Sequence, residues 1–393
     1  MNNCPILLEI SAGQSTGRQT TLRVPDKVIR GSLGFDEEIS VVFLNTSKDR
    51  EIGTIVAFDL SKAQAKPITR IIADSYFYSV ALSPDRTQVA AGAFNGYFSI
   101  WDVGWSDNVY EDTFDGVAIS TEFSNDGTLV VAGMEDGVIR IIETNTGKPV
   151  REIRKFSRRT FVRATISPDG DKIAGLYGNG AGAIYRTNGV PWLSFEIPNI
   201  TILKSPFLRF SPSGHSLISA YVPLKSRSDG SRHALSGRLV LDIWNIQWAQ
   251  RRVERKIVMM RNNQQIQNGM VGTTTNGMEF LPNGEQLAVA TTGGQIQMVD
   301  LKSGEVIAVL EGMHKGGVTS LAVNAELNWL VSGSTDGSVV LWDLAKMQPF
   351  SQITGIKKPV TELRFQGANR LLIGTGLIEM GNEYYIIQLE SSP

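Results

Sequence analysis

One short pattern recurs along the whole chain at a nearly constant spacing. Apolar runs end in a large residue, often followed by Asp or Asn, at Phe58, Trp101, Ile142, Tyr185, Trp244, Val299, Trp342 and Ile387. The steps between these positions are 43, 41, 43, 59, 55, 43 and 45 residues. Repeats of this length are single supersecondary units that bury their apolar faces against their neighbours. The chain is therefore predicted to be a repeat array.

A second signal runs in phase with the first and indicates strands within each unit. Turn sequences rich in Ser, Pro, Asp, Asn and Gly separate two apolar alternating runs at 83–86, 124–127, 167–170, 211–214 and 281–284. Pro presets one backbone dihedral and Gly tolerates a positive φ, so these residues suit tight reversals. The apolar alternation has a period of two, and no segment has a sustained helical stripe. Each unit therefore reads as four strands, and the fold class is all-β.

A unit of 40 to 45 residues with four strands and a Trp-Asp ending resembles the WD-repeat family, whose fold is the β-propeller. The resemblance is most specific in the stretch 314–344, which ends in Trp-Asp-Leu. It implies a buried hydrogen-bond relay through His314, Ser332, Asp336 and Trp342, at steps of 18, 4 and 6 residues. A buried indole and imidazole need such partners, so we interpret the set as structural and not as a hydrolase triad.

The repeat count predicts one domain over residues 1–393, a closed propeller of eight four-stranded antiparallel blades. Seven is the alternative, if the first unit (27–72) is an extension. After the last strand ending, only four residues remain, so the last blade lacks its outermost strand. A strand near the N-terminus, at 5–10 or 21–24, is expected to complete that blade and close the ring, which removes an exposed edge.

The two long steps predict additions to the regular scaffold. Residues 222–237 read as a surface insertion within the fifth unit, and 247–273 as a long connection into the sixth. Polar segments of this kind lie at the surface, where function is often added.

Composition narrows the function classes. The 38 Lys and Arg residues balance 39 Asp and Glu residues, which argues against a protein dedicated to nucleic acid or acidic membranes. The single cysteine, Cys4, excludes an intrachain disulfide, and we expect no signal peptide or membrane-spanning helix, hence a cytoplasmic location. The chain has three His residues and no HExxH, CxxC or GxxxxGK(S/T) pattern, and the G-x-G-x-x-A match at 178–183 precedes a strand where a nucleotide fingerprint needs a helix. We therefore expect no metal, no cofactor and no enzyme activity. A hydrolase or lyase built from Asp, Glu and Arg around the central channel stays open as an alternative.

Register suggests where a partner would bind. When the second strands of the units are aligned, Met134, Tyr177 and Tyr221 fall at the position of Ser334. This position lies beside one face of the propeller. The turns between second and third strands and the loops between units emerge on that face. Aromatic residues, Met and Arg are typical of binding hot spots. The candidates are Tyr76, Tyr78, Phe94, Met134, Arg159, Phe161, Tyr177 and Tyr221, with packing between blades as the alternative role. The leading hypothesis is a noncatalytic scaffold that docks a protein or peptide on this top face within a larger complex, and that is a monomer outside it.

Two basic runs, 151–163 and 251–261, support a different hypothesis. The stretch Phe156 to Thr160 resembles the Phe-Arg-Arg-Gly motif of phosphoinositide-binding propellers, without its Gly. The resemblance implies an anionic lipid partner, and nucleic acid is the other possibility for a basic surface. The candidates are Arg154, Lys155, Arg158, Arg159, Arg163, Arg251, Arg252 and Arg255. The alternative interpretation is that these are solvated residues of outer strands.

Overall fold

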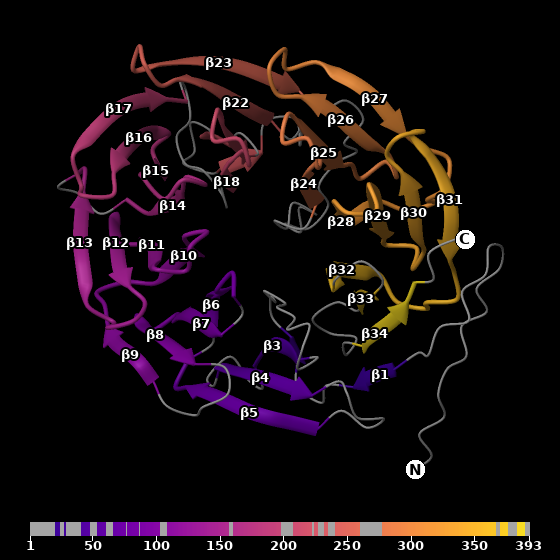
Figure 1. The fold of residues 1–393 in the computed structure, drawn as a ribbon, viewed down its shortest axis with the longest axis horizontal. Coiled ribbons are helices and arrows are strands. Elements are labelled where there is room, and N and C mark those ends of the chain that lie inside the picture. The colour runs from indigo at the N-terminus through magenta and orange to yellow at the C-terminus, as the bar shows by residue number, and fades with distance from the viewer. Residues whose placement is uncertain are drawn as a thin grey trace.

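Every helix or strand element in the described part of the chain is a β-strand (Figure 1). The computed structural model describes residues 20–23, 27–28, 41–47, 53–59, 66–75, 77–85, 87–102, 108–156, 160–197, 207–221, 224–226, 232–234, 240–259, 277–366, 370–375 and 383–389. No helix in these ranges is long and apolar enough to cross a membrane.

The strands form eight four-stranded antiparallel sheets around a common centre (Figure 1). Sheet 1 contains β2 (Lys27–Val28), β3 (Val41–Ser47), β4 (Gly53–Asp59) and β5 (Lys66–Ala73), and sheet 2 contains β6 (Phe77–Leu82), β7 (Gln88–Ala93), β8 (Tyr97–Asp102) and β9 (Asn108–Thr113). Sheet 3 contains β10 (Ala118–Phe123), β11 (Leu129–Met134), β12 (Val138–Glu143) and β13 (Pro149–Arg154), and sheet 4 contains β14 (Val162–Ile166), β15 (Lys172–Tyr177), β16 (Ala181–Arg186) and β17 (Pro191–Glu196). Sheet 5 contains β18 (Phe207–Phe210), β19 (Ser216–Tyr221), β22 (Val240–Gln247) and β23 (Arg252–Met259), and sheet 6 contains β24 (Met278–Phe280), β25 (Gln286–Ala290), β26 (Ile296–Asp300) and β27 (Val306–Leu310). Sheet 7 contains β28 (Val318–Asn324), β29 (Trp329–Ser334), β30 (Val339–Asp343) and β31 (Gln348–Ile353), and sheet 8 contains β32 (Val360–Gln366), β33 (Arg370–Thr375), β34 (Glu383–Gln388) and β1 (Thr20–Arg23).

Sheet 8 joins the two ends of the chain. β1 pairs with β34 in antiparallel register, from Thr20 opposite Ile386 to Arg23 opposite Glu383. The pairing gives β34 a neighbour on its outer side, as predicted for a strand near 21–24. The other candidate strand, 5–10, lies outside the described residues. The propeller prediction is thus confirmed, and the first unit forms a sheet of its own, sheet 1.

Apolar side chains fill the spaces between neighbouring sheets. One core cluster joins Val131 and Ile139 of sheet 3 to Val162 and Ile173 of sheet 4. Another cluster contains residues of sheets 7 and 8. Strands buried on both faces suit the continuous runs of Val, Ile, Leu and Ala seen in the second and third strand of each unit. The core is therefore distributed between the sheets, as a repeat architecture requires.

Tight turns join the second and third strands. Gly137, between β11 and β12, has φ 84° and a Cβ there would lie 2.5 Å from the carbonyl oxygen of Thr160. The turn therefore needs glycine both for its backbone conformation and for the close approach of the loop from sheet 3 to sheet 4.

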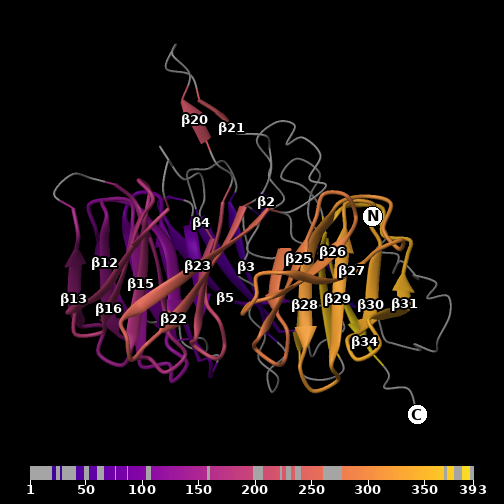
Figure 2. The same ribbon diagram turned by 90° about the horizontal axis from the view of Figure 1, so that it is seen from above.

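The two predicted additions to sheet 5 differ in outcome. Within 222–237, β20 (Leu224–Ser226) and β21 (Arg232–Ala234) pair as a two-stranded hairpin that projects from one face of the ring (Figure 2). The prediction that all of 247–273 is a connection is wrong, because 252–259 form β23, the fourth strand of sheet 5. The alternative interpretation of the basic run 251–261, as residues of an outer strand, fits β23. Residues 260–276 lie outside the described part.

Candidate functional site

The top face carries the turns between the second and third strands, including the β20–β21 hairpin (Figure 2). Loops that connect successive sheets reach the same side. The Phe114 amide donates to the carbonyl of Gly96 at 2.9 Å, and the Glu135 amide donates to the carbonyl of Val117 at 2.8 Å. Backbone hydrogen bonds therefore join the turns of sheets 2 and 3 to the loop between these two sheets.

Two of the predicted contact residues are wrong. Met134 and Tyr177 are both 0% exposed, so neither can contact a partner. Met134 lies opposite Ala118 and packs in the core between sheets 2 and 3. Tyr177 lies opposite Val162, and its hydroxyl is 3.3 Å from that of Tyr185. In sheets 3 and 4 this register position is therefore a packing position, because it faces the neighbouring sheet.

The other candidates vary in exposure. Phe94, in the turn between β7 and β8, is 52% exposed. Tyr78 of β6 is half-buried, and so is Phe161, whose ring occupies the space where a Cβ of Gly178 would lie. The side chains of Tyr76, Arg159 and Tyr221 lie outside the described part of the chain.

Phe94 has acidic neighbours. Its turn contacts the loop of Phe114 and Asp115, because a Cβ at Gly96 would lie 2.1 Å from the Phe114 carbonyl oxygen. That loop in turn lies against Glu135, whose Cβ is 3.5 Å from the Cβ position of Gly116. Asp115 and Glu135 are both exposed. We call Phe94, Asp115 and Glu135 the Phe94 patch: an exposed ring beside two carboxylates.

Beneath this patch, sheet 3 has a buried ion-pair network. Asp136 is 4% exposed, and its Oδ2 lies 3.5 Å from Nη2 of Arg140 and 3.4 Å from Nη2 of Arg154. Arg140 also donates from Nε to Glu152 at 3.0 Å, and its guanidinium stacks 4.3 Å from the centre of the Phe114 ring. The network holds the loop that carries Asp115.

Several predicted basic-patch residues bind within the protein. Arg154 donates to the side chain and carbonyl of Asp136. Lys155 donates from Nζ to the carbonyl of Gly182 at 2.9 Å, and burial lowers its pKa. Arg255 pairs with Asp242, which is 0% exposed, at 2.9 Å and stacks over Trp244.

The remaining basic candidates do not extend one continuous patch. Arg163 is half-buried on β14, whereas Arg251 and Arg252 are exposed at the start of β23. Arg158 lies outside the described residues. Sheet 4 separates the two runs, since β13 belongs to sheet 3 and β23 to sheet 5 (Figure 1). The two runs are therefore separate groups of outer-strand and loop residues.

The four residues of the relay in sheet 7 are linked by hydrogen bonds. Nε2 of His314 and Nε1 of Trp342 lie 2.7 and 2.8 Å from the Ser332 hydroxyl. Nδ1 of His314 lies 2.7 Å from the hydroxyl of Ser338, which donates to Asp336 at 2.6 Å. Ser338 is thus a fifth member, which the four-residue pattern missed. Burial raises the pKa of Asp336, but hydrogen bonds from Ser338 and Lys315 outweigh this effect and lower the pKa to about 2.

The relay has no geometry for nucleophilic catalysis. The Ser332 hydroxyl is fully buried and shared between an imidazole and an indole. Burial lowers the pKa of His314, although Asp336 opposes the shift. Neutral imidazole in a dry, satisfied network stabilises structure.

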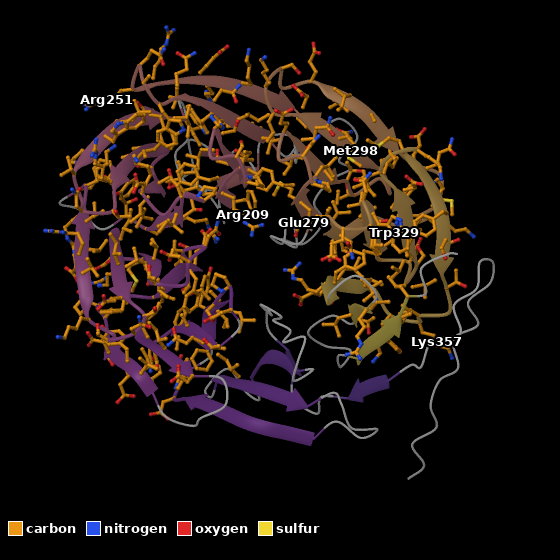
Figure 3. The ribbon with its side chains drawn as sticks, in the orientation of Figure 1. Arg209, Arg251, Glu279, Met298, Trp329 and Lys357 are labelled. Atoms are coloured by element: carbon orange, nitrogen blue, oxygen red, sulfur yellow. The ribbon has the colours of Figure 1, made fainter. Side chains whose placement is uncertain are left out.

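Charged residues on the first strands were missed by the sequence analysis. Arg209 of β18 and Glu279 of β24 point toward the central opening (Figure 3). Glu279 lies 3.8 Å from Arg364 of β32, which also lies 3.8 Å from Glu362. Burial raises the pKa of Glu122 on β10, and Arg209 opposes that shift. Aligning the residue before the last apolar position of each first strand would have revealed Glu122, Arg209, Glu279 and Arg364 together.

These inner charges compensate one another. The Glu279–Arg364 pair links sheets 6 and 8 across sheet 7. In the described part of the chain, no three His, Cys, Asp or Glu residues group as a metal site would require. The arrangement is that of bridges between sheets.

Known proteins resemble this chain in sequence and in fold. The family model for the WD domain, G-beta repeat, matches residues 66–102, 109–143 and 304–343. WD repeat-containing protein 1 of Xenopus tropicalis is 38% identical over 72 residues, which are 18% of this chain and 12% of that protein. The COMPASS component SWD1 of Saccharomyces cerevisiae is 28% identical over 123 residues, 30% of this chain and 28% of that protein. The chain thus spans less than a third of the length of these relatives.

Solved structures extend the similarity to nearly the whole chain. The computationally designed Ika8 protein superposes with a TM-score of 0.64 at 17% identity, over 93% of this chain and 98% of that one. BamB from Moraxella catarrhalis gives a TM-score of 0.61 at 13% identity, over 95% of this chain and 100% of that one. These two show the fold, and the family model shows where the WD repeats lie. The chain is a β-propeller that carries WD repeats in three places.

Proposed function

We propose that this protein is a noncatalytic interaction platform that docks a protein or peptide partner on its top face within a larger assembly. The observation that carries the proposal is the Phe94 patch. A phenylalanine side chain that is 52% exposed stands in a tight turn, beside the exposed carboxylates Asp115 and Glu135. The partner expected there presents an apolar side chain with basic residues next to it.

Rigidity supports this role. The turn of Phe94 is held by the hydrogen bond from the Gly96 amide to the carbonyl of Ala93 at 3.1 Å. The neighbouring loop is held by Arg140, which stacks on Phe114. A preformed surface loses little conformational entropy when it binds, and an exposed aromatic ring can supply a large share of the affinity. Carboxylates at the rim would steer a basic partner and favour its selection.

The names of two relatives refer to larger assemblies. One relative is named a component of COMPASS, and another, from Saccharomyces cerevisiae, is named U3 small nucleolar RNA-associated protein 12. The second is 34% identical over 65 residues, 7% of its length. These names support a partner within a complex as the general expectation for this chain.

The two other hypotheses have less support. A phosphoinositide or nucleic-acid surface would need free cations, yet Arg154, Lys155 and Arg255 bind acceptors within the protein. A hydrolase or lyase in the channel would need carboxylates available to a substrate. Glu279 and Glu362 instead lie beside Arg364. Top-face docking is therefore the function that the geometry supports best.

The test compares two phenylalanines of similar exposure. Phe94→Ala removes the ring from the top face, and Phe350→Ala removes a 43% exposed ring from β31 on the outer rim as the matched control. Tagged proteins would be purified from cells and their partners quantified by mass spectrometry. We expect one set of partners to be depleted about tenfold or more by Phe94→Ala and kept by Phe350→Ala. Equal recovery with both variants and wild type would refute docking at this patch.

Charge gives a second arm of the same test. Asp115→Lys with Glu135→Lys reverses the charge beside the ring while leaving the ring in place. The same partners should be lost, and cross-links from wild type should join position 115 to a basic segment. Cross-links confined to other faces would also contradict the proposal.

A further inference from the structure

The outer strand of each sheet is an exposed edge, and the edges of this ring are protected unequally. A free edge can pair with another strand, and proteins block this with charged residues or proline. Among the eight outer strands that the structure describes, seven contain a charged residue or a proline: β1, β5, β9, β13, β17, β23 and β31. β27, with the sequence Val-Ile-Ala-Val-Leu, contains neither.

The side chains of β27 are apolar, and three of the five are exposed. Val306 is 41% exposed, Ile307 48% and Val309 44%. Exposed apolar side chains therefore follow one another along this outer strand, where exposed apolar surface marks an interaction site.

Charge at the two ends of β27 indicates what binds there. Glu305 precedes the strand and Glu311 follows it, and both are exposed. The exposed cations Lys302 and Lys315 lie further along the chain, beyond these carboxylates. An added strand would thus meet an apolar centre between two acidic ends.

We propose that β27 is a docking edge for a partner segment that binds as an added β-strand, with alternating apolar side chains and basic residues at both ends. Backbone hydrogen bonds to a free edge give such a segment its affinity, and the side-chain pattern gives it specificity. This surface lies on the outer rim and is independent of the Phe94 patch.

A second copy of this chain fits the edge less well than a basic segment. In the antiparallel register that overlaps all five residues of β27, Ala308 faces its own copy. Glu305 of each copy then faces Glu311 of the other, because the two are placed equally about Ala308. Like charges directly opposite in a pair of strands are destabilising.

The experiment uses two synthetic peptides and the full chain. One peptide alternates valine and threonine between pairs of lysines, and the other has the same centre between pairs of glutamates. Binding is measured by fluorescence anisotropy of labelled peptide. We expect the wild type to bind the lysine peptide more tightly than the glutamate peptide, and Phe94→Ala to bind it as the wild type does.

Substitutions on the edge complete the test. Val309→Lys should weaken binding of the lysine peptide about tenfold or more, because a charge enters the apolar centre. Val150→Lys, at a 49% exposed position of β13, is the matched control and should leave binding unchanged. Val309→Thr keeps the shape without a new charge and should weaken binding less, which guards against misfolding as the cause. Glu305→Lys with Glu311→Lys should reverse the preference between the two peptides.

Three results would overturn the proposal. The first is equal affinity of wild type and Val309→Lys for the lysine peptide. The second is an unchanged peptide preference after the double charge reversal. The third is a dimer of the wild type, seen by analytical ultracentrifugation and abolished by Val309→Lys, which would assign the edge to a second copy.

Discussion

Sheets 3 and 7 place an aspartate at the same point of the same turn and use it in different ways. In sheet 7, Asp336 accepts hydrogen bonds from the amides of Lys315 and Gly316 and from Ser338, and a neutral relay continues to Trp342. In sheet 3, Asp136 faces two guanidinium groups. Asp136 is buried and Asp336 is exposed, so the same turn position binds different donors in the two sheets.

The two sheets differ in the residue at one position of the third strand. Arg140 lies opposite Ala132 in sheet 3, whereas Val340 lies opposite Ser332 at the corresponding pair of sheet 7. Ala132 has no hydrogen-bonding side chain, and Arg140 opposite it reaches Asp136, whereas the hydroxyl of Ser332 binds the imidazole of His314. Sheet 5 combines the two: Ser219 accepts from Trp244 at 3.3 Å, and Asp242 pairs with Arg255. These three sheets thus use different local sets of partners at the same region of the blade.

The largest effect is expected in sheet 3. Asp136→Ala leaves the side chain of Arg140, which is 9% exposed, without one of its two carboxylates. Removing one partner of a buried ion pair strands a charge, so the free energy of unfolding should fall by about 3 kcal/mol. Urea unfolding followed by tryptophan fluorescence measures the loss. Asp343→Ala, which removes a carboxylate at the surface pair with Lys346, is the control. A loss no greater than in the control would mean that Glu152 alone balances Arg140.

The next effect is expected in sheet 7. Ser332→Ala removes the shared partner of His314 and Trp342, so the free energy of unfolding should fall by about 2 kcal/mol because two buried nitrogens lose a hydrogen bond. A double-mutant cycle with Trp342→Phe separates the indole contact from packing. Strictly additive effects of the two substitutions would contradict a direct coupling between these side chains.

Acid should affect the relay of sheet 7 through His314 before it affects Asp336. Burial lowers the pKa of His314 in the folded state. The folded protein therefore keeps its full stability above the unfolded pKa of about 6.5 and loses stability as the pH falls below that value, because the unfolded state binds the proton first. Asp336, with a pKa of about 2, loses its contribution only below about pH 4. Melting temperatures at pH 7.5, 6.5 and 5.5 should therefore fall more steeply for the wild type than for His314→Gln. Parallel curves would show that His314 does not contribute to this pH dependence.

The smallest effect on the free energy of unfolding is expected for Arg154 in sheet 3. Arg154 shares Asp136 with Arg140, but its side chain is 47% exposed. Arg154→Ala should lower the free energy of unfolding by only about 0.5 kcal/mol, because solvent screens the pair. Arg154→Ala measured in the Asp136→Ala background should then cost nearly nothing. A loss as large as that of Asp136→Ala would instead make Arg154 the main partner of the aspartate.

The sequence predicted the propeller because its period is set by local chemistry. Turns such as 167–170 need Pro, Asp and Gly wherever they occur, and strands buried on both faces need β-branched and aliphatic residues. A closing strand was also predicted near 21–24, and β1 pairs there with β34. In contrast, the sequence left two interpretations of β23 open, a connection over 247–273 and an outer strand over the basic run 251–261, and the structure shows the strand.

Residue roles at the surface depended on neighbours far away in the chain. Met134 and Phe94 are both large apolar residues near a turn, yet one is buried against sheet 2 and the other faces solvent. The ion pair between Glu279 and Arg364 likewise joins strands that are more than eighty positions apart. Repetition along the chain determined the ring of sheets, because each unit folds by the same local rules. Exposure, ion pairing and the unprotected edge of β27 were decided only when the sheets came together, because burial depends on which surfaces meet in three dimensions.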